Sequence, residues 1–418
     1  MDLHGRHLRM ANNFYQEYFD YVGPTESPRI YHRWMAISTI AALLGRSVYF
    51  PFGHSNIYPN HYIMLVGNPG ARKGAALKPA KNVLKAIEFD KLGPDRISPE
   101  KFLGEMMALN GEIEIDGVDF ENLNFSTPSE IYVIADEFGD FIRGNVDFIR
   151  LLTNLWDNLD HYKHPKFHGK SVYVHEPTIN IIGATTQQDM SITLPFEAIG
   201  QGFLSRFILI YGEPTGTKIT FPGGVNPYKM MIMEKKLKKI QELNGKMQPS
   251  DEAKNFLDRI YKSYSDIDDY RFKHYNTRRF THLLKLCMVF AAMDETLIIN
   301  PQHVLQANTL LYVTEQRMPK ALGEFGKSKN SDVANNILEY LKTAKRPMQI
   351  RDIWKKVSQD LNRIDDLVEI IRNLEAAERI QKKEMGGKVG FLPYYKTDNQ
   401  WDKDLLIQQE FLTVEEMV

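Results

Sequence analysis

The sequence predicts an α/β protein built on a parallel sheet. Five apolar runs predict strands, namely SVYFPF, YIMLVG, IYVIADE, TINIIGATT and FLSRFILIYG. The second run is almost wholly apolar, as expected for a strand that is buried on both faces of a sheet. Stretches with helical periodicity separate the runs, and this alternation is typical of a parallel α/β sheet.

Length and composition indicate a globular protein of more than one domain. A chain of 418 residues is too long for one ordinary core, so we expect two or three domains. An apolar fraction of 43% with 25% charged residues excludes the disordered, collagenous and coiled-coil classes. The net charge of −1 gives no general attraction for polyanions, so contacts with nucleic acid would need local basic clusters.

The cysteine content and the lack of membrane signals predict a cytoplasmic protein. Cys287 is the single cysteine, which excludes a disulfide framework and a zinc ribbon and favours a reducing compartment. The start MDLHGRHLRM lacks the apolar run of a signal peptide, and no stretch of about 18 apolar residues occurs. We therefore expect no membrane partner.

Changes of pattern along the chain predict its domains. The Pro- and Gly-rich stretch GEPTGTKITFPGGVNP marks the exit from the sheet, and helical periodicity follows it. Further on, three short helical patterns precede the strand-turn-strand RIQKKEMGGKVGFLP, which favours a winged helix. The expected regions are an N-terminal helical region (1–44), the sheet core (45–215), a helical lid subdomain (216–325), a winged-helix domain (331–395) and an acidic tail (396–418).

The strongest chemical signal is the stretch LVGNPGARKGAALKPAKNVL, residues 65–84. A buried strand ends at Val66, a glycine-containing loop follows, and Lys73 opens an amphipathic helix, as a phosphate-binding loop requires. Backbone N–H groups of the loop and of the helix N-terminus would converge on the β- and γ-phosphates of a nucleotide, and Lys73 would neutralise them. The expected nucleotide-binding residues are Gly67, Asn68, Pro69, Gly70, Ala71, Arg72, Lys73, Gly74 and Ala75.

Two residues of this loop depart from the pattern G-x-x-x-x-G-K-[ST]. Arg72 replaces the second glycine, where it adds charge but would strain the turn if its φ is positive. Gly74 replaces Ser or Thr and so removes the hydroxyl that normally binds Mg²⁺. The alternative interpretation is a glycine-rich turn between a strand and a helix that binds no nucleotide.

Acidic and polar residues end two further predicted strands. The run IYVIADE ends in an acid pair, as a Walker B strand would: Asp136 would hold Mg²⁺ through water, and Glu137 would polarise the attacking water. In INIIGATTQQ, Thr186 would contact the γ-phosphate or the lytic water, the role called sensor 1. The alternatives are a solvated acid pair and a threonine that is bonded locally.

Arginines at two places are candidates for contacts with the nucleotide. Arg206 stands just before the apolar strand in GFLSRFILI, where it would act as a finger that reaches the γ-phosphate of a neighbouring subunit in a ring. Arg278 and Arg279 open the helix FTHLLKLCMVFAAM, and we take Arg279 as the candidate sensor 2 arginine. The alternative for this pair is a solvated helix start.

A basic and aromatic segment, HYKHPKFHGKSVYVH (161–175), lies between the acidic strand and the sensor strand. It contains four His, three Lys, three aromatic residues and no acid, so it would track a phosphate backbone while its rings lie against bases. The alternatives are a plain surface hairpin and a metal site that uses three of the histidines. The DNA-binding candidates are Lys163, Lys166, His168 and Lys170, and the histidines of the metal alternative are His161, His164 and His168.

The C-terminal unit gives a weaker signal. Lys382, Lys383 and Lys388 would grip a nucleic-acid backbone. The expected recognition helix, NRIDDLVEIIRNLEAAE, carries several acids, which argues against tight insertion into a major groove. Contacts of this unit or of the acidic tail with replication proteins are equally open.

The chain resembles a family of P-loop ATPases that are encoded by phages and mobile elements and related to the AAA+ replicative helicases of the superfamily III and MCM type. The resemblance covers roughly residues 28–320. Members have loops of the form G-x-x-G-x-R-K-S, so Arg72 fits the family and Gly74 departs from it. The matching stretches are RWMAISTIAALLGR, YPNHYIMLVGNPGARKG, IADEFGDFI, TINIIGATTQQ, GFLSRFILIYGE and RRFTHLLKLCMVFAA.

The resemblance implies a P-loop NTPase core of AAA+ type that binds ATP and Mg²⁺ and assembles as a homo-oligomer, a hexameric ring. The implied function is an ATP-dependent replicative DNA helicase that moves on single-stranded or forked DNA. The alternative is a replication initiator or helicase loader that uses ATP for assembly without processive unwinding, which Gly74 and the lack of strong basic charge favour slightly. A third interpretation is a phage-defence or structural assembly ATPase without a DNA substrate.

Overall fold

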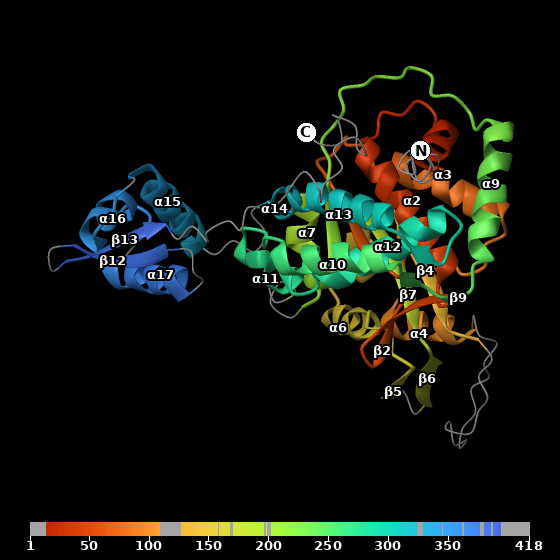
Figure 1. Cartoon of the computed structure of the whole chain (residues 1–418), viewed down its shortest axis with the longest axis horizontal. Coiled ribbons are helices and arrows are strands. Elements are labelled where there is room, and N and C mark those ends of the chain that lie inside the picture. Colours follow the sequence, from red (N-terminus) through yellow and green to blue (C-terminus); the bar gives the residue numbers. More distant parts are fainter. Residues whose placement is uncertain are drawn as a thin grey trace. The chain divides into compact units, whose positions relative to one another are not determined.

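The computed structural model describes residues 14–108, 127–323 and 329–393, with gaps at 158, 168–169, 196–197, 199–201, 345, 362, 377–379 and 386–387. The chain divides after Gly323 into two compact units (Figure 1). The larger unit combines the predicted N-terminal helices, the sheet core and the helical lid. The smaller unit contains the predicted winged-helix domain, and the acidic tail 396–418 lies outside the described residues.

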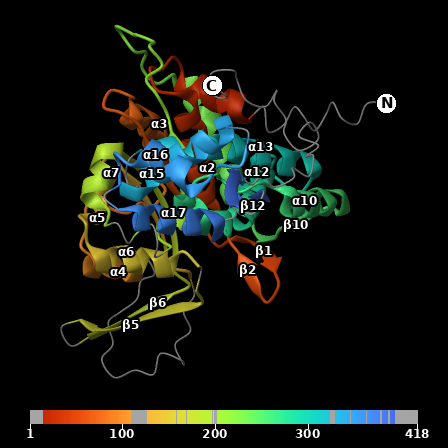
Figure 2. The ribbon, with the colours of Figure 1, turned by 90° about the vertical axis from the view of Figure 1, so that its left-hand side faces the viewer.

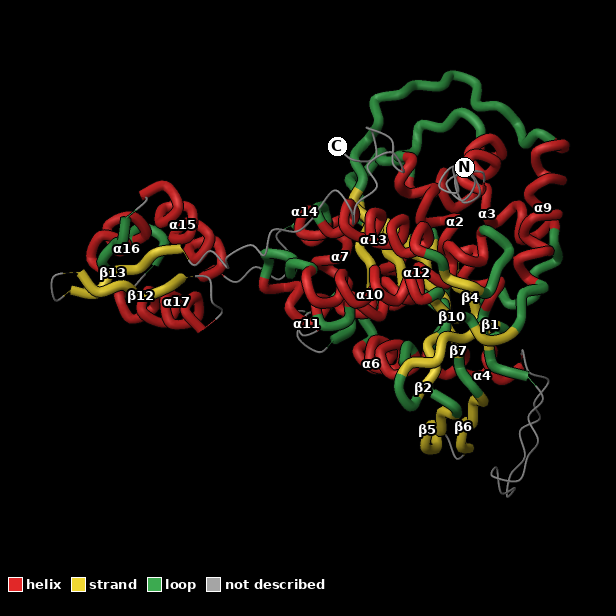
Figure 3. The backbone as a smooth tube through the Cα atoms, in the orientation of Figure 1, coloured by secondary structure: helices red, strands yellow, loops and turns green. Residues whose placement is uncertain are grey.

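The larger unit is built on a four-stranded sheet in which all strands run parallel. Figure 3 shows strands of this unit in yellow among its red helices. Every strand residue is buried except Tyr211, which is half-buried. This burial confirms four of the five predicted apolar strands and the α/β class. The strands lie in the order β4 (Glu130–Ala135), β7 (Thr178–Thr185), β3 (Tyr62–Val66) and β8 (Phe207–Tyr211).

One predicted strand lies outside this sheet. The run SVYFPF forms β1 (Val48–Phe52), which pairs antiparallel with β2 (Ser55–Ile57) and parallel with β9 (Gly245–Lys246). The expectation that this run joins the parallel sheet is wrong. Its last two residues, Pro51 and Phe52, are exposed, and a proline without an N–H suits a small hairpin better than a central strand.

Helix α2 (Arg29–Leu44) covers one face of the sheet and confirms the helix predicted there. All of its residues after the first are buried, and it packs against β3, β7 and β8. The Tyr132 hydroxyl of β4 donates to Ser38 Oγ of this helix at 3.0 Å. Helices α9 (Pro227–Gln241) and α12 (Arg279–Met293) pack against α2, so the predicted lid segment shares the core of the sheet.

Helices α5 (Phe138–Ile142) and α6 (Val146–Leu155) cover the opposite face. A Cβ at Gly183 of β7 would lie 2.6 Å from the ring of Phe138, so this glycine allows the close approach of α5. The Tyr62 hydroxyl of β3 donates to a backbone carbonyl of α6 at 3.0 Å. The sheet therefore lies between two helical layers.

The helical periodicity predicted between residues 228 and 322 is confirmed. Trp34 Nε1 of α2 donates to Thr314 Oγ1 at 3.0 Å, which ties this segment to the central helix. Within the part of the chain that the structure describes, no helix has the length and apolar character needed to cross a membrane. The other elements of the unit are α3 (Lys73–Ala86), α4 (Pro99–Ala108), β5 (His161–Phe167), β6 (Lys170–His175), α7 (Gln187–Thr193), β10 (Gln248–Pro249), α10 (Asp251–Ser263), α11 (Lys273–Asn276), β11 (Ile298–Ile299), α13 (Pro301–Glu315) and α14 (Met318–Leu322).

The smaller unit contains three helices followed by a two-stranded antiparallel hairpin. Met385 pairs with Lys388, and the two glycines of the predicted turn, 386–387, lie outside the described residues. Buried side chains from all five elements, among them Ile337, Ile353 and Leu367, form its own core. The elements are α15 (Lys329–Ala344), α16 (Ile350–Val357), α17 (Ile364–Ala376), β12 (Ile380–Met385) and β13 (Lys388–Pro393).

Candidate functional site

The predicted phosphate loop lies at the carboxyl edge of the parallel sheet, between β3 and α3. Because the four strands run parallel, their carboxyl ends meet at this edge. Asp136 and Glu137 follow β4 there, and Thr186 follows β7. Strand β7 lies between β3 and β4, and Val66 pairs with Thr185. The fold therefore brings the loop, the acid pair and the polar strand end together.

Gly67 allows the loop to leave β3 in close contact with two other segments. A Cβ at this position would lie 2.5 Å from the Tyr31 hydroxyl oxygen and 2.6 Å from the Gly212 carbonyl oxygen. The Tyr31 hydroxyl, which is fully buried on α2, donates to the carbonyls of Val66 (2.7 Å) and Gly212 (3.0 Å). The start of the loop is thus fixed by a buried side chain.

Arg72 adopts the left-handed conformation at the position before α3. Its φ is 54° and its ψ is 34°, so the strain that the sequence predicts for a non-glycine residue here is confirmed. Its Nε lies 2.7 Å from Oε2 of Glu26, which is far away in the sequence. This ion pair fixes the side chain of a residue whose backbone is strained.

Lys73 lies inside the loop rather than in solvent. Its Nζ donates to the carbonyls of Gly67 (2.7 Å) and Asn68 (3.3 Å). Partial burial lowers the pKa of the ammonium group, and the nearby Glu137 carboxylate opposes this shift. The lysine cation therefore lies between loop carbonyls and an acid, where it could instead meet phosphate oxygens.

The acid pair is exposed where β4 ends. Asp136 Oδ2 accepts a hydrogen bond from Lys81 Nζ at 3.1 Å, and the Asp136 side chain is still 58% exposed. Among the residues that the structure describes, no group of three or more His, Cys, Asp and Glu could hold a metal ion. One or two carboxylates with phosphates and water are, however, a normal ligand set for Mg²⁺, so this open carboxylate fits that ion.

Thr186 begins helix α7 at the same edge. Its Oγ1 accepts a hydrogen bond from the Asp189 amide at 3.0 Å, while Thr185 Oγ1 donates to Asp189 Oδ2 at 2.9 Å. Both hydroxyls thus have the local partners that the alternative interpretation predicts. The Thr186 hydroxyl oxygen caps helix α7 as a hydrogen-bond acceptor. The hydroxyl hydrogen could still donate to a ligand.

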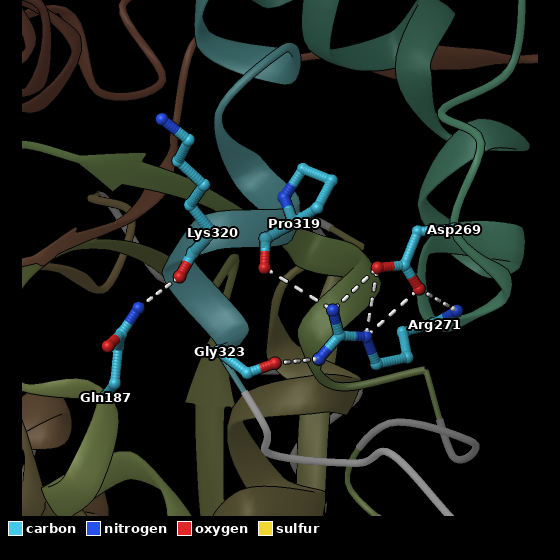
Figure 4. A network of polar contacts seen from close by, with 6 residues as sticks. All are labelled: Gln187, Asp269, Arg271, Pro319, Lys320 and Gly323. Carbon is cyan, nitrogen blue, oxygen red and sulfur yellow. Dashed lines mark hydrogen bonds and ion pairs between the residues drawn. The ribbon is translucent and has the colours of Figure 1, made fainter. Parts of the chain in front are cut away.

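The next residue, Gln187, joins this edge to the helical segment (Figure 4). Its amide nitrogen donates to the Lys320 carbonyl in α14. Arg271 donates to the Gly323 carbonyl at the end of the same helix (2.8 Å) and pairs with Asp269 (2.6 Å). A cation is favourable at a helix C-terminus. The end of α14 is therefore attached to the strand end that carries the threonine.

Arg206 lies at the opposite edge of the sheet. It precedes β8, whose first residue, Phe207, pairs with Tyr62, the first residue of β3. A strand of this length spans about 13 Å, so the side chain is remote from the phosphate loop of its own chain. The guanidinium is buried, with Nη2 2.8 Å from Asp157 Oδ2 and Nη1 donating to the Gly202 carbonyl at 2.8 Å.

Three cationic side chains lie close to the ring of Trp156 at this amino edge. The charged groups of Lys285, Arg206 and Arg278 lie 4.3, 5.7 and 5.9 Å from its ring centroid. Within the described part of the chain, the buried Nε atoms of both arginines and Nε1 of the tryptophan have no hydrogen-bond partner. The half-exposed Asp157 is the counter-charge of Arg206, so the amino edge has an excess of positive charge.

Arg279 is not brought to the phosphate loop. Its guanidinium is buried and donates to Glu315 Oε2 and Asn308 Oδ1, both at 3.0 Å, so it ties α12 to α13. One turn further along α12, His282 Nε2 lies 3.2 Å from the Ser205 carbonyl, which places this helix end at the amino edge. The position predicted for sensor 2 therefore carries a structural ion pair.

The basic segment forms the predicted hairpin, β5 with β6, which projects from the body of the unit (Figure 2). Lys163 is exposed and pairs with Tyr173, whose ring stacks on His161 at a centroid distance of 5.8 Å. Nothing in these contacts tests binding to DNA. His168 and the side chains of Lys166, Lys170 and His164 lie outside the description.

The sequence did not point to the residues that hold the loop from a distance. Glu26 and Tyr31 contact it from segments far away in the chain, and Asp157 does the same for Arg206. No spacing rule connects such partners. Arg72 is the residue that could have indicated a distant partner, because a non-glycine residue in a strained backbone conformation needs other contacts to stabilise it.

Comparison with other proteins gives no family for this chain. No protein-family model matches it, and no curated protein matches it. In this chain a glycine loop with an inward lysine, an exposed acid pair and a polar strand end share one edge of a parallel sheet.

Proposed function

We propose that the larger unit is a P-loop ATPase core of AAA+ type, which binds ATP with Mg²⁺ at the carboxyl edge of its sheet. One observation carries this proposal: Lys73, Glu137 and Thr186 follow three neighbouring parallel strands at one edge of the sheet, where a glycine loop leads into a helix N-terminus. The alternative, a glycine turn that binds no ligand, does not explain why Lys73 points into the loop and lies near an exposed acid pair.

Each group at this edge has a chemical task in the proposed reaction. Backbone N–H groups at the start of α3 and the Lys73 ammonium would bind phosphate oxygens, and the ammonium would leave the loop carbonyls to do so. Asp136 would hold Mg²⁺ through water, and that ion would neutralise charge on the phosphates. Glu137, exposed and close to the lysine, would polarise the attacking water.

We further propose that the protein is a homo-oligomeric ring, a hexamer, in which Arg206 serves the nucleotide of a neighbouring subunit. Its distance from the loop of its own chain supports action between subunits. In the isolated chain Asp157 holds the guanidinium, so assembly would have to open this pair. The positive amino edge of one subunit would then face the phosphates of the next.

The function that we propose is an ATP-dependent helicase acting on single-stranded or forked DNA. The projecting β5–β6 hairpin, with Lys163 exposed, supports a contact with a phosphate backbone. In the smaller unit, three helices and a hairpin have the make-up of a winged helix, and Lys382 pairs with Glu375 at 2.8 Å. We propose this unit as a contact for DNA or for replication proteins.

The second candidate is a replication initiator or helicase loader in which ATP drives assembly without processive unwinding. Two observations favour it. Gly74 offers no hydroxyl to Mg²⁺, and Arg206 is buried in an ion pair within its own chain. Both would slow hydrolysis more than binding.

ATP turnover measured with and without single-stranded DNA, followed by unwinding of a forked duplex, separates the candidates. A helicase predicts stimulation by DNA together with unwinding, and both should disappear in Lys73→Ala. A loader predicts nucleotide-dependent assembly of wild type without unwinding. Absence of ATP binding in wild type would reject the ATPase proposal as a whole.

A further inference from the structure

The chain that follows β8 is connected to both ends of the glycine loop, directly at one end and through Glu26 at the other. At the first end, the Gly212 carbonyl oxygen would lie 2.6 Å from a Cβ at Gly67, so the two backbones are in close contact. At the second end, Glu26 pairs with Arg72 at 2.7 Å and accepts a hydrogen bond from the Ile219 amide at 2.8 Å. Segment 212–219 is thus joined to the loop at two places.

Glu26 makes the second connection between segment 212–219 and the glycine loop, and it is held by several contacts. Its carboxylate is held by the Ile219 amide and by Arg72, which together lower its pKa, the amide having the larger effect. Its backbone carbonyl accepts a hydrogen bond from Thr215 Oγ1 at 3.0 Å. The Glu26 side chain is 22% exposed against 59% for Arg72, so the acid is the anchored partner of the pair.

We infer that Glu26 is a positioning residue that couples the phosphate loop to segment 212–226, so that ATP on the loop orders this segment. The inference rests on the proposed nucleotide binding. Arg72 is strained and lies next to Lys73, so a loop that closes on phosphates shifts Arg72 and, through the carboxylate, the Ile219 amide. Because coupling is reciprocal, a segment held in place also favours the closed loop.

Two apolar side chains of this segment are exposed, and ordering of the segment would fix their position. Phe221 is 89% exposed and Val225 is 50% exposed, and the segment leads into α9. The structure shows this stretch crossing between the end of β8 and α9 on the outside of the unit (Figure 1). Nucleotide on the loop would therefore set the place of two apolar side chains.

Hydrogen exchange of the amides of residues 215–221 tests the coupling in the full chain. We expect exchange to slow several-fold in wild type when a non-hydrolysable ATP analogue and Mg²⁺ are added. Glu26→Gln keeps the acceptor for Ile219 but removes the charge that holds Arg72, so the nucleotide-dependent slowing should be lost. The affinity for the analogue should fall by no more than about fivefold, as expected for a half-exposed ion pair.

Glu17→Gln is the matched control, because Glu17 also forms an ion pair of 2.7 Å, with Lys236, and its side chain is 28% exposed, close to the value for Glu26. This variant should keep the slowing. Arg72→Gly removes the same pair from the other side while relieving the left-handed strain, so it too should lose the slowing when the analogue is present at a concentration that saturates the variant. Slowing that persists in both Glu26→Gln and Arg72→Gly would overturn the inference.

The failure of the inference and the failure of the proposed function give different results. If calorimetry shows no binding of the analogue to wild type, the proposed ATPase is wrong. If wild type binds the analogue and Lys73→Ala does not, but exchange of residues 215–221 is unchanged by nucleotide, only the coupling is wrong.

Discussion

The two edges of the parallel sheet hold similar kinds of residue in different environments. At the carboxyl edge, Lys73 is half-buried while Asp136 and Glu137 are exposed. At the amino edge, Arg206 and Lys285 are buried around Trp156. Charged groups that are open to solvent can exchange their partners for a ligand at little cost, whereas buried ones are committed to the partners they have. Exposure therefore separates the edge where we propose that a nucleotide binds from the edge whose charged groups already have partners within the chain.

The pKa values of Lys285 and Lys73 show the same difference in environment between the two edges. Burial lowers the pKa of Lys285 to about 7, and the opposing effect of Asp157 is the smaller one. At the other edge the pKa of Lys73 is also lowered by burial, but Glu137 opposes the change. The charged form of the lysine at the amino edge thus costs folding free energy, whereas the lysine at the carboxyl edge has a nearby carboxylate that favours its charged form.

The largest effects are expected from the carboxyl edge. Lys73→Ala should lose nucleotide binding, on the order of 100-fold in Kd, because a charged partner of the phosphates is removed. Glu137→Gln should keep binding and abolish turnover, because water is no longer activated. Titration calorimetry and a steady-state ATPase assay measure the two effects.

Lys78→Ala is the control for the first substitution, since Lys78 is an exposed lysine on the same helix. It should bind and hydrolyse ATP as wild type does. ATPase activity equal to wild type in both Lys73→Ala and Glu137→Gln would reject the assignment of the site to this edge.

The second prediction tests the amino edge. Arg206→Ala should leave the nucleotide affinity of the isolated subunit nearly unchanged and lower turnover of the assembly by about 10³- to 10⁵-fold, as expected when an arginine finger is lost. Mixing with Lys73→Ala subunits should restore part of the activity. One variant then supplies Arg206 and the other supplies an intact loop.

The alternative for Arg206 is the pair that it makes with Asp157 in its own chain. A purely structural pair predicts no recovery at any mixing ratio and a loss of folding stability in Arg206→Ala. Lack of recovery in rings shown by mass spectrometry to be mixed would therefore remove the finger and weaken the ring helicase with it.

The third prediction concerns folding stability at the amino edge. Because the pKa of Lys285 falls from 10.5 to about 7 on folding, the unfolded chain binds a proton between these pH values that the folded chain lacks. Stability should therefore rise with pH across this window, by up to ~1.4 kcal/mol per pH unit from this group. Urea unfolding at pH 7.5 and 9.5 measures the slope.

Lys285→Met should flatten this slope. The substitution also leaves the Asn60 oxygens that accept from Lys285 without this donor, which lowers stability at both pH values alike. The difference between the two pH values is therefore the decisive quantity. An unchanged slope in Lys285→Met would show that the lysine is not the titrating group.

Local patterns in the sequence predicted the four strands of the sheet and the glycine loop between a strand and a helix, because each depends on residues that are neighbours in the chain. The sequence also indicated that Arg72 would be strained if its φ were positive, but the sign of φ came from the structure. The pairing of β1 could not be predicted, since an apolar run does not specify which strand it joins. The carboxylate partners of the buried Arg206 and Arg279 lie 49 and 36 positions away, so only the fold reveals that these arginines are engaged.

The smallest effect is expected from Gly74→Ser at the carboxyl edge. Gly74 is exposed in the first turn of α3, and no described atom outside its own turn lies within 4 Å of a Cβ built there, so a side chain fits. If the added hydroxyl binds Mg²⁺, the Mg²⁺ concentration for half-maximal turnover should fall by about fivefold, equivalent to ~1 kcal/mol. Gly74→Ala is the matched control, because it adds the same Cβ without the hydroxyl and gains at least as much helix propensity over glycine as serine does. Equal Mg²⁺ titrations for the serine and alanine variants would mean that water already fills this position, and the missing hydroxyl would then no longer favour the loader over the helicase.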